Sequence, residues 1–267
     1  MKSLKIFVCA ATAFAALLTL QLNCHAQSKL YQNMNASERA RFVSETVKTL
    51  GRQISETEYQ LTPSFETEIQ RSLDVYVQRL ADKSTDPRLI IERAQSQAPL
   101  IMTSFKARGV SPLIGLYLAW IESEFVNLST PSKAGALGMF QFLPSTGARF
   151  GLNTDDLLDV GKSADAAARY LAKNMDAFQE DKMKEVLAII SYNRGEQKVR
   201  DELFQAGNSA EKGCSVCALS AQQAKLSKSK QNDPDYVARF FAAAIFGENP
   251  QLFGLSTPPV SSFGTGN

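Results

Sequence analysis

The stretch Trp120-Ile121-Glu122-Ser123-Glu124-Phe125 ends a run that is too apolar for a surface helix. Ser111 and Pro112 supply a helix cap and a first helical position, and a broad apolar face follows them. Glu122 stands near the end of this expected buried helix. Burial raises the pKa of a carboxyl, as a general acid requires near neutral pH. The alternative is a carboxylate that is merely paired with a nearby arginine or backbone amide.

The small-residue stretch Ala134-Gly135-Ala136-Leu137-Gly138 follows this helix and leads into Met139 and Phe140. Such residues let a backbone approach a flat ligand closely. They also serve tight helix packing, so both interpretations stay open.

Other carboxylates near Glu122 are candidates for a second catalytic group. Glu124 lies about 200° around the helix from Glu122, so it is expected in solvent and outside the same site. Asp155, Asp156 and Asp159 belong to the next loop, and their alternative is a solvated acidic turn.

Residues 27–100 read as helices that pack on the core, with a separate binding function as the other interpretation. The first expected helix covers about 35–51 and is stopped by Gly51, and the second covers 62–80. A third begins at Asp86-Pro87, and Pro99 is expected to break or kink it. After the small-residue stretch, helices are expected over 164–178, 183–190 and 236–246, the last of them amphipathic. A surface excursion is expected over 206–232, and a flexible tail over 251–267.

Residues 1–26 have the three parts of a secretory signal peptide: Lys2 and Lys5, an apolar run, and small residues at a cleavage site before Gln27. An uncleaved anchoring helix is the alternative, but the run is short for a span. Cleavage lowers the 29 lysines and arginines to 27, equal to the 27 acids. Such a chain is not expected to capture nucleic acid electrostatically. His25, the only histidine, leaves with the signal, which excludes histidine-based mechanisms.

Cys214 and Cys217 are the cysteines left after cleavage. In an exported protein the pair predicts a local disulfide, and a redox-active Cys-x-x-Cys is the alternative. Two soft ligands are short of the four that zinc uses, so no metal and no cofactor are expected.

Three separated motifs then coincide in order and spacing: Glu122-Ser123, Gly138-Met139-Phe140-Gln141 through Pro144-Ser145-Thr146-Gly147, and Tyr192-Asn193-Arg194-Gly195. Together they resemble the Glu-Ser, Gly-Leu-Met-Gln and Ala-Tyr-Asn signatures of the lytic transglycosylase family. The membrane-bound D type, whose catalytic domain is similar to goose-type lysozyme, is resembled most. The resemblance implies an all-α, lysozyme-like catalytic domain over 101–250, with a helical N-terminal region over 27–100.

The family cleaves the MurNAc-GlcNAc β-1,4 bond of peptidoglycan without water and leaves 1,6-anhydro ends. By resemblance, Glu122 is the single acid and then base, and the substrate's N-acetyl group stabilises C1. The residues expected to bind the sugars are Ser132, which assists the N-acetyl group, Gln141, Tyr192, Asn193, the apolar wall of Met139 and Phe140, and Tyr236 facing the glutamate.

Two departures from the family pattern bear on function. The segment between Glu122 and Gly138 is one residue longer than in the soluble enzyme, which displaces Ser132. Arg194 replaces a small residue, where it either grips a peptide carboxylate or blocks a subsite. A hydrolytic lysozyme and a glycan-binding or assembly protein without turnover are the alternatives. The expected location is the periplasm. Targeting is expected to come from the catalytic cleft, from residues 27–100, or from a protein partner of the cell wall or a secretion machine.

Overall fold

The computed structural model describes residues 29–55, 57–82, 86–206, 213–226 and 235–264. Across these ranges the chain is all-α, as predicted, without a strand beyond one isolated bridge between Leu137 and Phe142. The α-helices are α2 (Ala36–Ser55), α3 (Pro63–Arg79), α4 (Pro87–Lys106), α5 (Pro112–Ser123), α6 (Pro144–Ala148), α7 (Val160–Ala177), α8 (Lys184–Arg194), α9 (Glu196–Ala206), α10 (Ser215–Leu226) and α11 (Tyr236–Glu248). Short 3-10 turns cover η1 (Tyr31–Asn33), η2 (Asp156–Leu158), η3 (Pro250–Phe253) and η4 (Val260–Gly264).

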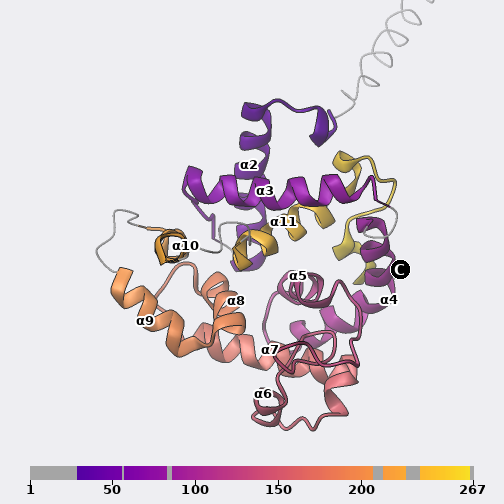
Figure 1. Ribbon diagram of the computed structural model, residues 1–267, viewed down its shortest axis with the longest axis vertical. Helices are drawn as coiled ribbons and strands as arrows, with labels where there is room; N and C mark the ends of the chain where they lie inside the picture. The colour runs from indigo at the N-terminus through magenta and orange to yellow at the C-terminus, as the bar shows by residue number, and fades with distance from the viewer. Residues whose placement is uncertain (1–28, 56, 83–85, 207–212, 227–234, 265–267) are drawn as a thin grey trace, which may run out of the picture.

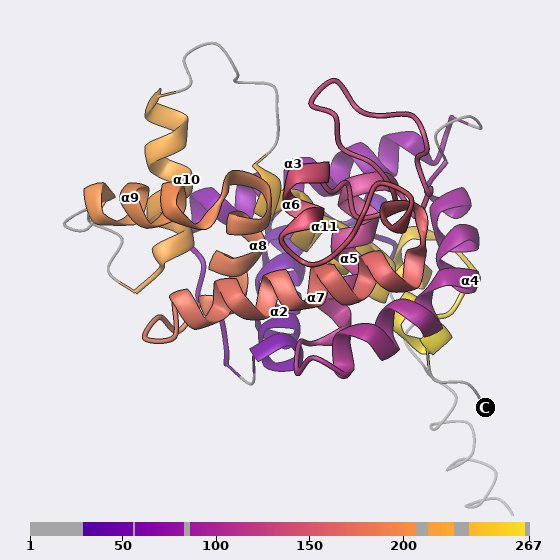
Figure 2. The ribbon, with the colours of Figure 1, turned by 90° about the horizontal axis from the view of Figure 1, so that it is seen from below.

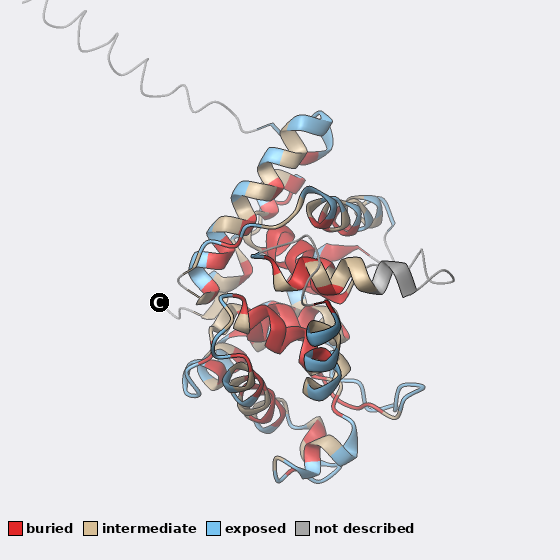
Figure 3. Cartoon of the chain, turned by 90° about the vertical axis from the view of Figure 1, so that its left-hand side faces the viewer, coloured by how far each residue is buried: buried red, intermediate tan, exposed pale blue. Residues whose placement is uncertain are grey.

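Two buried helices, α5 and α11, form the centre of the molecule. In Figure 1, α2 and α3 lie on one side of this pair, and α6 and α7 lie on the other. Trp120 is 1% exposed, and its ring centroid lies 5.8 Å from that of Tyr76 on α3 and 6.2 Å from that of Phe246 on α11. Burial of each such ring contributes roughly 2 to 3 kcal/mol to stability. The buried residues gather in the middle of the molecule, with exposed residues on the outer faces of the surrounding helices (Figure 3).

The helices of the N-terminal region pack on this centre, as predicted. Thr62 caps α3 by accepting a hydrogen bond from the Phe65 amide at 3.4 Å, and α3 lies against α11. Gly51 does not stop α2, which continues to Ser55. The glycine serves packing instead, because a Cβ there would lie 3.0 Å from the Tyr59 ring.

Two expectations around α4 and α5 are corrected. Of the break or kink expected at Pro99, the break does not occur, because α4 runs on to Lys106 with its inner face buried. Ser111 occupies the cap position of α5 but makes no side-chain cap; its hydroxyl donates to the Gln53 carbonyl oxygen at 3.3 Å. Pro112 is the first residue of α5, as predicted.

The C-terminal segment over 251–264 is not a flexible tail. Phe253 is 2% exposed, and its ring centroid lies 4.5 Å from that of Phe246 and 5.2 Å from that of Tyr31. Val260 is fully buried where η4 packs on α4. These apolar contacts hold a stretch whose glycines and prolines alone indicated no structure.

Two further segments are more buried than predicted. Helix α11 is buried almost all round and so is a central helix, not an amphipathic one. Part of the expected surface excursion forms α10, whose Val216 and Leu219 are each 1% exposed and which packs on α8 and α9.

The expected signal peptide, 1–26, lies outside the described residues. Within the described part, none of the helices combines the length and apolar character needed to cross a membrane.

Candidate active site

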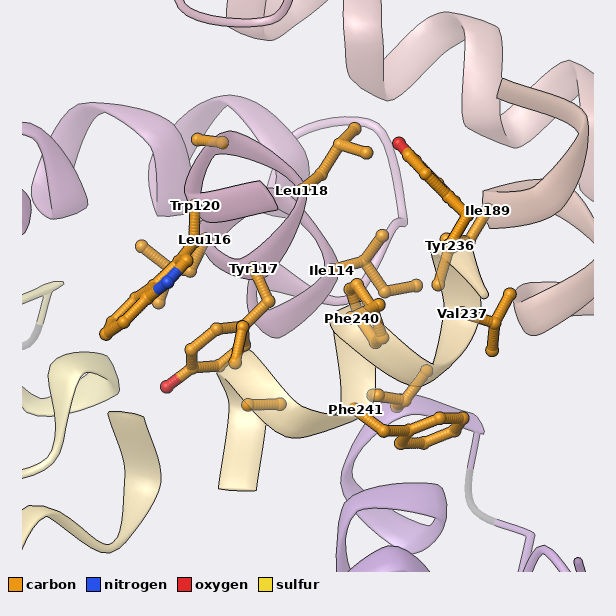
Figure 4. Packing of buried hydrophobic residues seen from close by; sticks show 14 of the residues in the cluster. Ile114, Leu116, Tyr117, Leu118, Trp120, Ile189, Tyr236, Val237, Phe240 and Phe241 are labelled. Atoms are coloured by element: carbon orange, nitrogen blue, oxygen red, sulfur yellow. The ribbon is translucent and has the colours of Figure 1, made fainter. Parts of the chain in front are cut away.

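Glu122 and Tyr236 meet where the end of α5 approaches the start of α11. The phenol of Tyr236 donates a short hydrogen bond to Oε1 of Glu122. Helix α11 begins at this tyrosine because the Asp235 side chain accepts a hydrogen bond from the Val237 amide at 2.9 Å. Figure 4 shows the Tyr236 ring on the same helix as Val237 and Phe241, with its oxygen pointing away from both. The helix cap therefore sets the position of a phenol against a carboxylate.

Burial dominates the electrostatics of Glu122. Desolvation raises the pKa of this carboxyl, whereas the Tyr236 hydrogen bond and the charge of Arg239 partly oppose the rise. The Arg239 guanidinium lies 5.6 Å from the centroid of the Tyr236 ring and donates to the Ile121 carbonyl oxygen at 3.4 Å. A carboxyl in such surroundings is suited to stay protonated and to give its proton to a bound ligand. The sequence-based prediction of a partly desolvated acid at this helix end is confirmed.

The chain leaves α5 through a left-handed turn that begins two residues after Glu122. Glu124 and Phe125 have φ angles of 52° and 59°, which cost non-glycine residues about 1 kcal/mol or more each. Arg79 pairs with the Glu124 carboxylate at 2.7 Å, and Arg93 donates to the Glu124 carbonyl oxygen at 2.7 Å. Glu124 was expected in solvent; it is instead half-buried and paired, because the two arginines hold the turn.

Tyr192, near the end of α8, is a second tyrosine close to Glu122. Its hydroxyl donates to the Phe140 carbonyl oxygen at 2.8 Å, and its ring centroid lies 5.3 Å from that of Tyr170 on α7. Burial, followed by the charge of Glu122, raises the pKa of the Tyr192 phenol well above its usual value. Tyr192 therefore lies within electrostatic reach of the acid and stays a neutral hydrogen-bond donor.

Residues 100–214 match the family model described as the transglycosylase SLT domain. This segment is a transglycosylase SLT domain. The match covers less than half of the chain and includes Glu122 and Tyr192, but it ends before Tyr236. The chain is also similar to peptidoglycan transglycosylase gp16 of Escherichia phage T7, at 36% identity over 112 residues. That alignment covers 40% of this chain and 8% of the phage protein, so the chain spans a small fraction of that relative's length.

The SLT-domain loop that contacts Tyr192 is closed by its own hydrogen bonds and packed on the core. The Gln141 side-chain amide donates to the Gly138 carbonyl oxygen at 2.8 Å, in a turn where Gln141 has a φ of 49°. Met139 and Phe140 were expected to form an apolar wall of the sugar site, but both are 0% exposed, so their side chains belong to the core. The Phe140 ring stacks on Phe105 at 5.9 Å, and its backbone carbonyl supports Tyr192.

Two expected sugar-binding residues of the SLT domain are exposed. Ser132 accepts a hydrogen bond from the Ala136 amide at 3.0 Å through its hydroxyl, which closes its own loop. Asn193 lies near the end of α8, directly after Tyr192. The structure thus brings Tyr236 and Tyr192 to Glu122, and it places Ser132 and Asn193 at the surface.

The aspartates expected as alternative catalytic groups serve local structure. Asp156 pairs with Lys162 at 2.5 Å, and Asp159 accepts a hydrogen bond from the Lys162 amide at 2.9 Å as the cap of α7. Asp155 is exposed. Within the described residues, no group of three His, Cys, Asp or Glu side chains could hold a metal ion.

Arg194 neither faces the acid nor stands unpaired. Its guanidinium lies 3.3 Å from the Glu202 carboxylate and 3.7 Å from that of Asp235, the residue that caps α11. Arg194 therefore ties the end of α8 to the helix start that carries Tyr236.

Arg239 and Tyr170 were not singled out from the sequence, although Arg239 stands three residues after Tyr236, on the same face of a helix.

Cys214 and Cys217 form a disulfide at the start of α10. Both cysteines are buried, and the Cys217 sulfur accepts a hydrogen bond from the Thr62 amide at 3.3 Å. The local disulfide predicted from the sequence is present and lies against the chain that leads into α3.

Proposed function

We propose that this chain is a lytic transglycosylase that cleaves the MurNAc-GlcNAc β-1,4 bond of peptidoglycan without water and leaves 1,6-anhydro-MurNAc ends. The observation that carries the proposal is the half-buried, desolvated acid Glu122 of the SLT domain, which accepts a hydrogen bond from Tyr236. Among the described residues, the groups that shift the pKa of Glu122 are a phenol and a guanidinium, not a second carboxylate. Two-carboxylate glycosidases need such a partner as nucleophile or as base for water.

In the proposed reaction, Glu122 gives its proton to the leaving glycosidic oxygen as the bond from C1 to that oxygen breaks. The substrate's own N-acetyl group stabilises the electron-poor C1. The Glu122 carboxylate then takes the proton of the MurNAc C6 hydroxyl, whose oxygen bonds to C1. The acid is restored, and no water is consumed.

Neighbouring groups stabilise the deprotonated state of the acid. The Tyr236 phenol supports the carboxylate by hydrogen bonding, and Arg239 supports it by charge. We assign Tyr192, Gln141 and Asn193 to sugar contacts, with Ser132 at the N-acetyl side. In this assignment Phe140 holds Tyr192 through its backbone carbonyl oxygen, and Met139 stays in the core.

Product analysis tests this function. Purified peptidoglycan incubated with the protein is expected to release fragments one water lighter than hydrolysis products, as measured by mass spectrometry. Fragments with free reducing ends would mean hydrolysis and would return attention to Asp155, Asp156 and Asp159. Strands that are bound but left intact would indicate a binding or assembly protein.

Replacement of Tyr236 by phenylalanine is expected to move the alkaline limb of the activity profile to higher pH. The reason is that the phenol lowers the pKa of Glu122, and the acid works only while protonated, so activity falls as the pH rises through that pKa. Measurement of kcat/KM against pH checks this. Tyr117→Phe is the matched control, because Tyr117 is a buried tyrosine bonded to a different glutamate, Glu248. If the alkaline limb of the Tyr236→Phe profile stays at the pH of the unaltered protein, Tyr236 does not control the pKa of the acid.

We also propose that the chain is exported to the periplasm, where its substrate lies. The support is the signal-peptide pattern of residues 1–26. Mass spectrometry of the protein recovered from a periplasmic extract is expected to show a chain that begins at Gln27. A chain that retains Lys2 and Lys5 would contradict cleavage.

A further inference from the structure

A cavity of about 390 Å³ opens where α7, the end of α8 and the start of α9 come together. Helix α8 packs on α7 and on α9 (Figure 2). Four cationic side chains and one carboxylate line the cavity: Arg149, Lys173, Arg194, Lys198 and Glu196. Such an excess of positive charge is local, because the chain without residues 1–26 has equal numbers of basic and acidic residues.

Most of this positive charge is not neutralised by the protein. Arg194 is paired with Glu202 and Asp235, and Glu196 lies 3.4 Å from Arg200. For the remaining three cations, the described residues place no carboxylate within ion-pair distance. Arg149, Lys173 and Lys198 come from three separate segments and converge on one hollow. Convergent unpaired cations around a cavity favour an anionic ligand.

The side chain of Tyr170 separates the cavity from Tyr192, which is assigned to the sugar site. Tyr170 lines it, and the Tyr170 ring centroid lies 5.3 Å from that of Tyr192. Tyr192 is in turn within electrostatic reach of Glu122. Arg194 belongs both to the cavity wall and to the ion pair at the start of α11. A ligand that extends from a sugar bound at Tyr192 could therefore reach this cavity.

We propose that this cavity binds the free carboxylates of the peptide stem of a peptidoglycan strand, so that the enzyme acts preferentially on peptide-bearing strands. The inference rests on the proposed function and names a feature of its substrate. MurNAc carries the stem on its lactyl group, so a strand seated at Glu122 would project a flexible acidic peptide from the sugar site. The three unpaired cations supply charge-assisted hydrogen bonds for it.

Comparison of two substrates tests the preference. Release of fragments is measured on intact strands and on strands stripped of peptide by an amidase. The unaltered protein is expected to cleave peptide-bearing strands faster, and the ratio of the two rates should fall about five-fold in the double variant Lys173→Gln/Lys198→Gln. The matched control, Lys106→Gln/Lys182→Gln, removes two exposed lysines outside the cavity and should keep the ratio. Equal rates on both substrates by the unaltered protein would overturn the proposal.

A binding measurement separates this inference from the proposed function. The probe is the free tripeptide alanyl-isoglutamyl-diaminopimelate, followed by NMR titration of the folded, full chain. Binding that disappears when the carboxylates are amidated, and weakens in the cavity variant but not in the control, would support the site even if no strand is cleaved. Inorganic phosphate that binds as well as the tripeptide would indicate a general anion site and would overturn the peptide assignment, as would no binding.

Discussion

Glu122→Gln is expected to lower the rate of strand cleavage by about a thousand-fold while the protein stays folded. Glutamine nearly matches the shape of glutamate, and its carbonyl oxygen can still accept the hydrogen bond from Tyr236. It cannot give a proton to the leaving oxygen. Fragment release from purified peptidoglycan measures the loss, and binding of intact strands should persist.

The same variant is expected to be more stable than the unaltered protein at neutral pH. Burial raises the pKa of Glu122 in the folded state, so the folded protein holds this proton more tightly than the unfolded chain does. The stabilisation that the protonated Glu122 carboxyl contributes is complete below its pKa in the unfolded chain. It is lost as the pH rises through the raised pKa of the folded state. Glutamine avoids that loss. Thermal unfolding should show a gain in Tm at neutral pH that disappears in acid.

Glu124→Gln provides the matched control for Glu122→Gln. It makes the same chemical change two residues away, at a carboxylate paired with Arg79 and Arg93. This control is expected to keep most of the turnover and to gain no stability. Full activity in Glu122→Gln, or equal losses in both variants, would show that Glu122 is not the acid.

Gly138→Ala is expected to have the largest effect on stability, about 3 kcal/mol or more. Gly138 has a φ of +76°, a conformation that costs other residues about 1 to 2 kcal/mol. In addition, a Cβ there would lie 2.1 Å from the Leu157 carbonyl oxygen, so the loop or η2 must move. Denaturant unfolding measures the loss. Activity should fall with it, because the same turn carries Gln141 and the Phe140 carbonyl that holds Tyr192.

Gly135→Ala separates backbone strain from the clash. Gly135 has a similar φ of +85° but nothing within 4 Å of the added Cβ. Its loss should be limited to the strain, about 1 kcal/mol. Equal losses in the two variants would mean that the contact with Leu157 is unimportant and that backbone strain alone explains the effect at Gly138.

The acid and its partner were predictable because local patterns place them. The apolar run over 113–121 requires a buried helix, and Glu122 at its end must then be partly desolvated. Tyr236 follows Asp235, a good helix cap, at the start of another apolar segment. Neither pattern shows that the two helix ends meet. The family resemblance suggested that Tyr236 faces Glu122, and the tertiary structure shows the hydrogen bond between them.

The errors occurred where distant packing overrides local preference. Gly51 and Pro99 are helix breakers by preference, yet α2 and α4 continue through them because both helices bury a face against the core. The C-terminal segment has the composition of a loose tail, but Phe253 and Val260 find apolar partners on elements far away in sequence. Glu124 was expected in solvent from its angular position on the helix alone. The arginines that pair with it lie on α3 and α4, far away in sequence, so no local pattern predicted them.

The sequence by itself determined the all-α class, the buried helix that carries Glu122, the disulfide pair and the motifs of the SLT domain. All of these depend on residues close together along the chain or on short fixed spacings. Only the tertiary structure decided that Tyr236 bonds to Glu122, that Arg194 ties α8 to α11, and that three cations converge on one cavity. These features join residues from separate helices, and no local spacing reports the distance between helix ends.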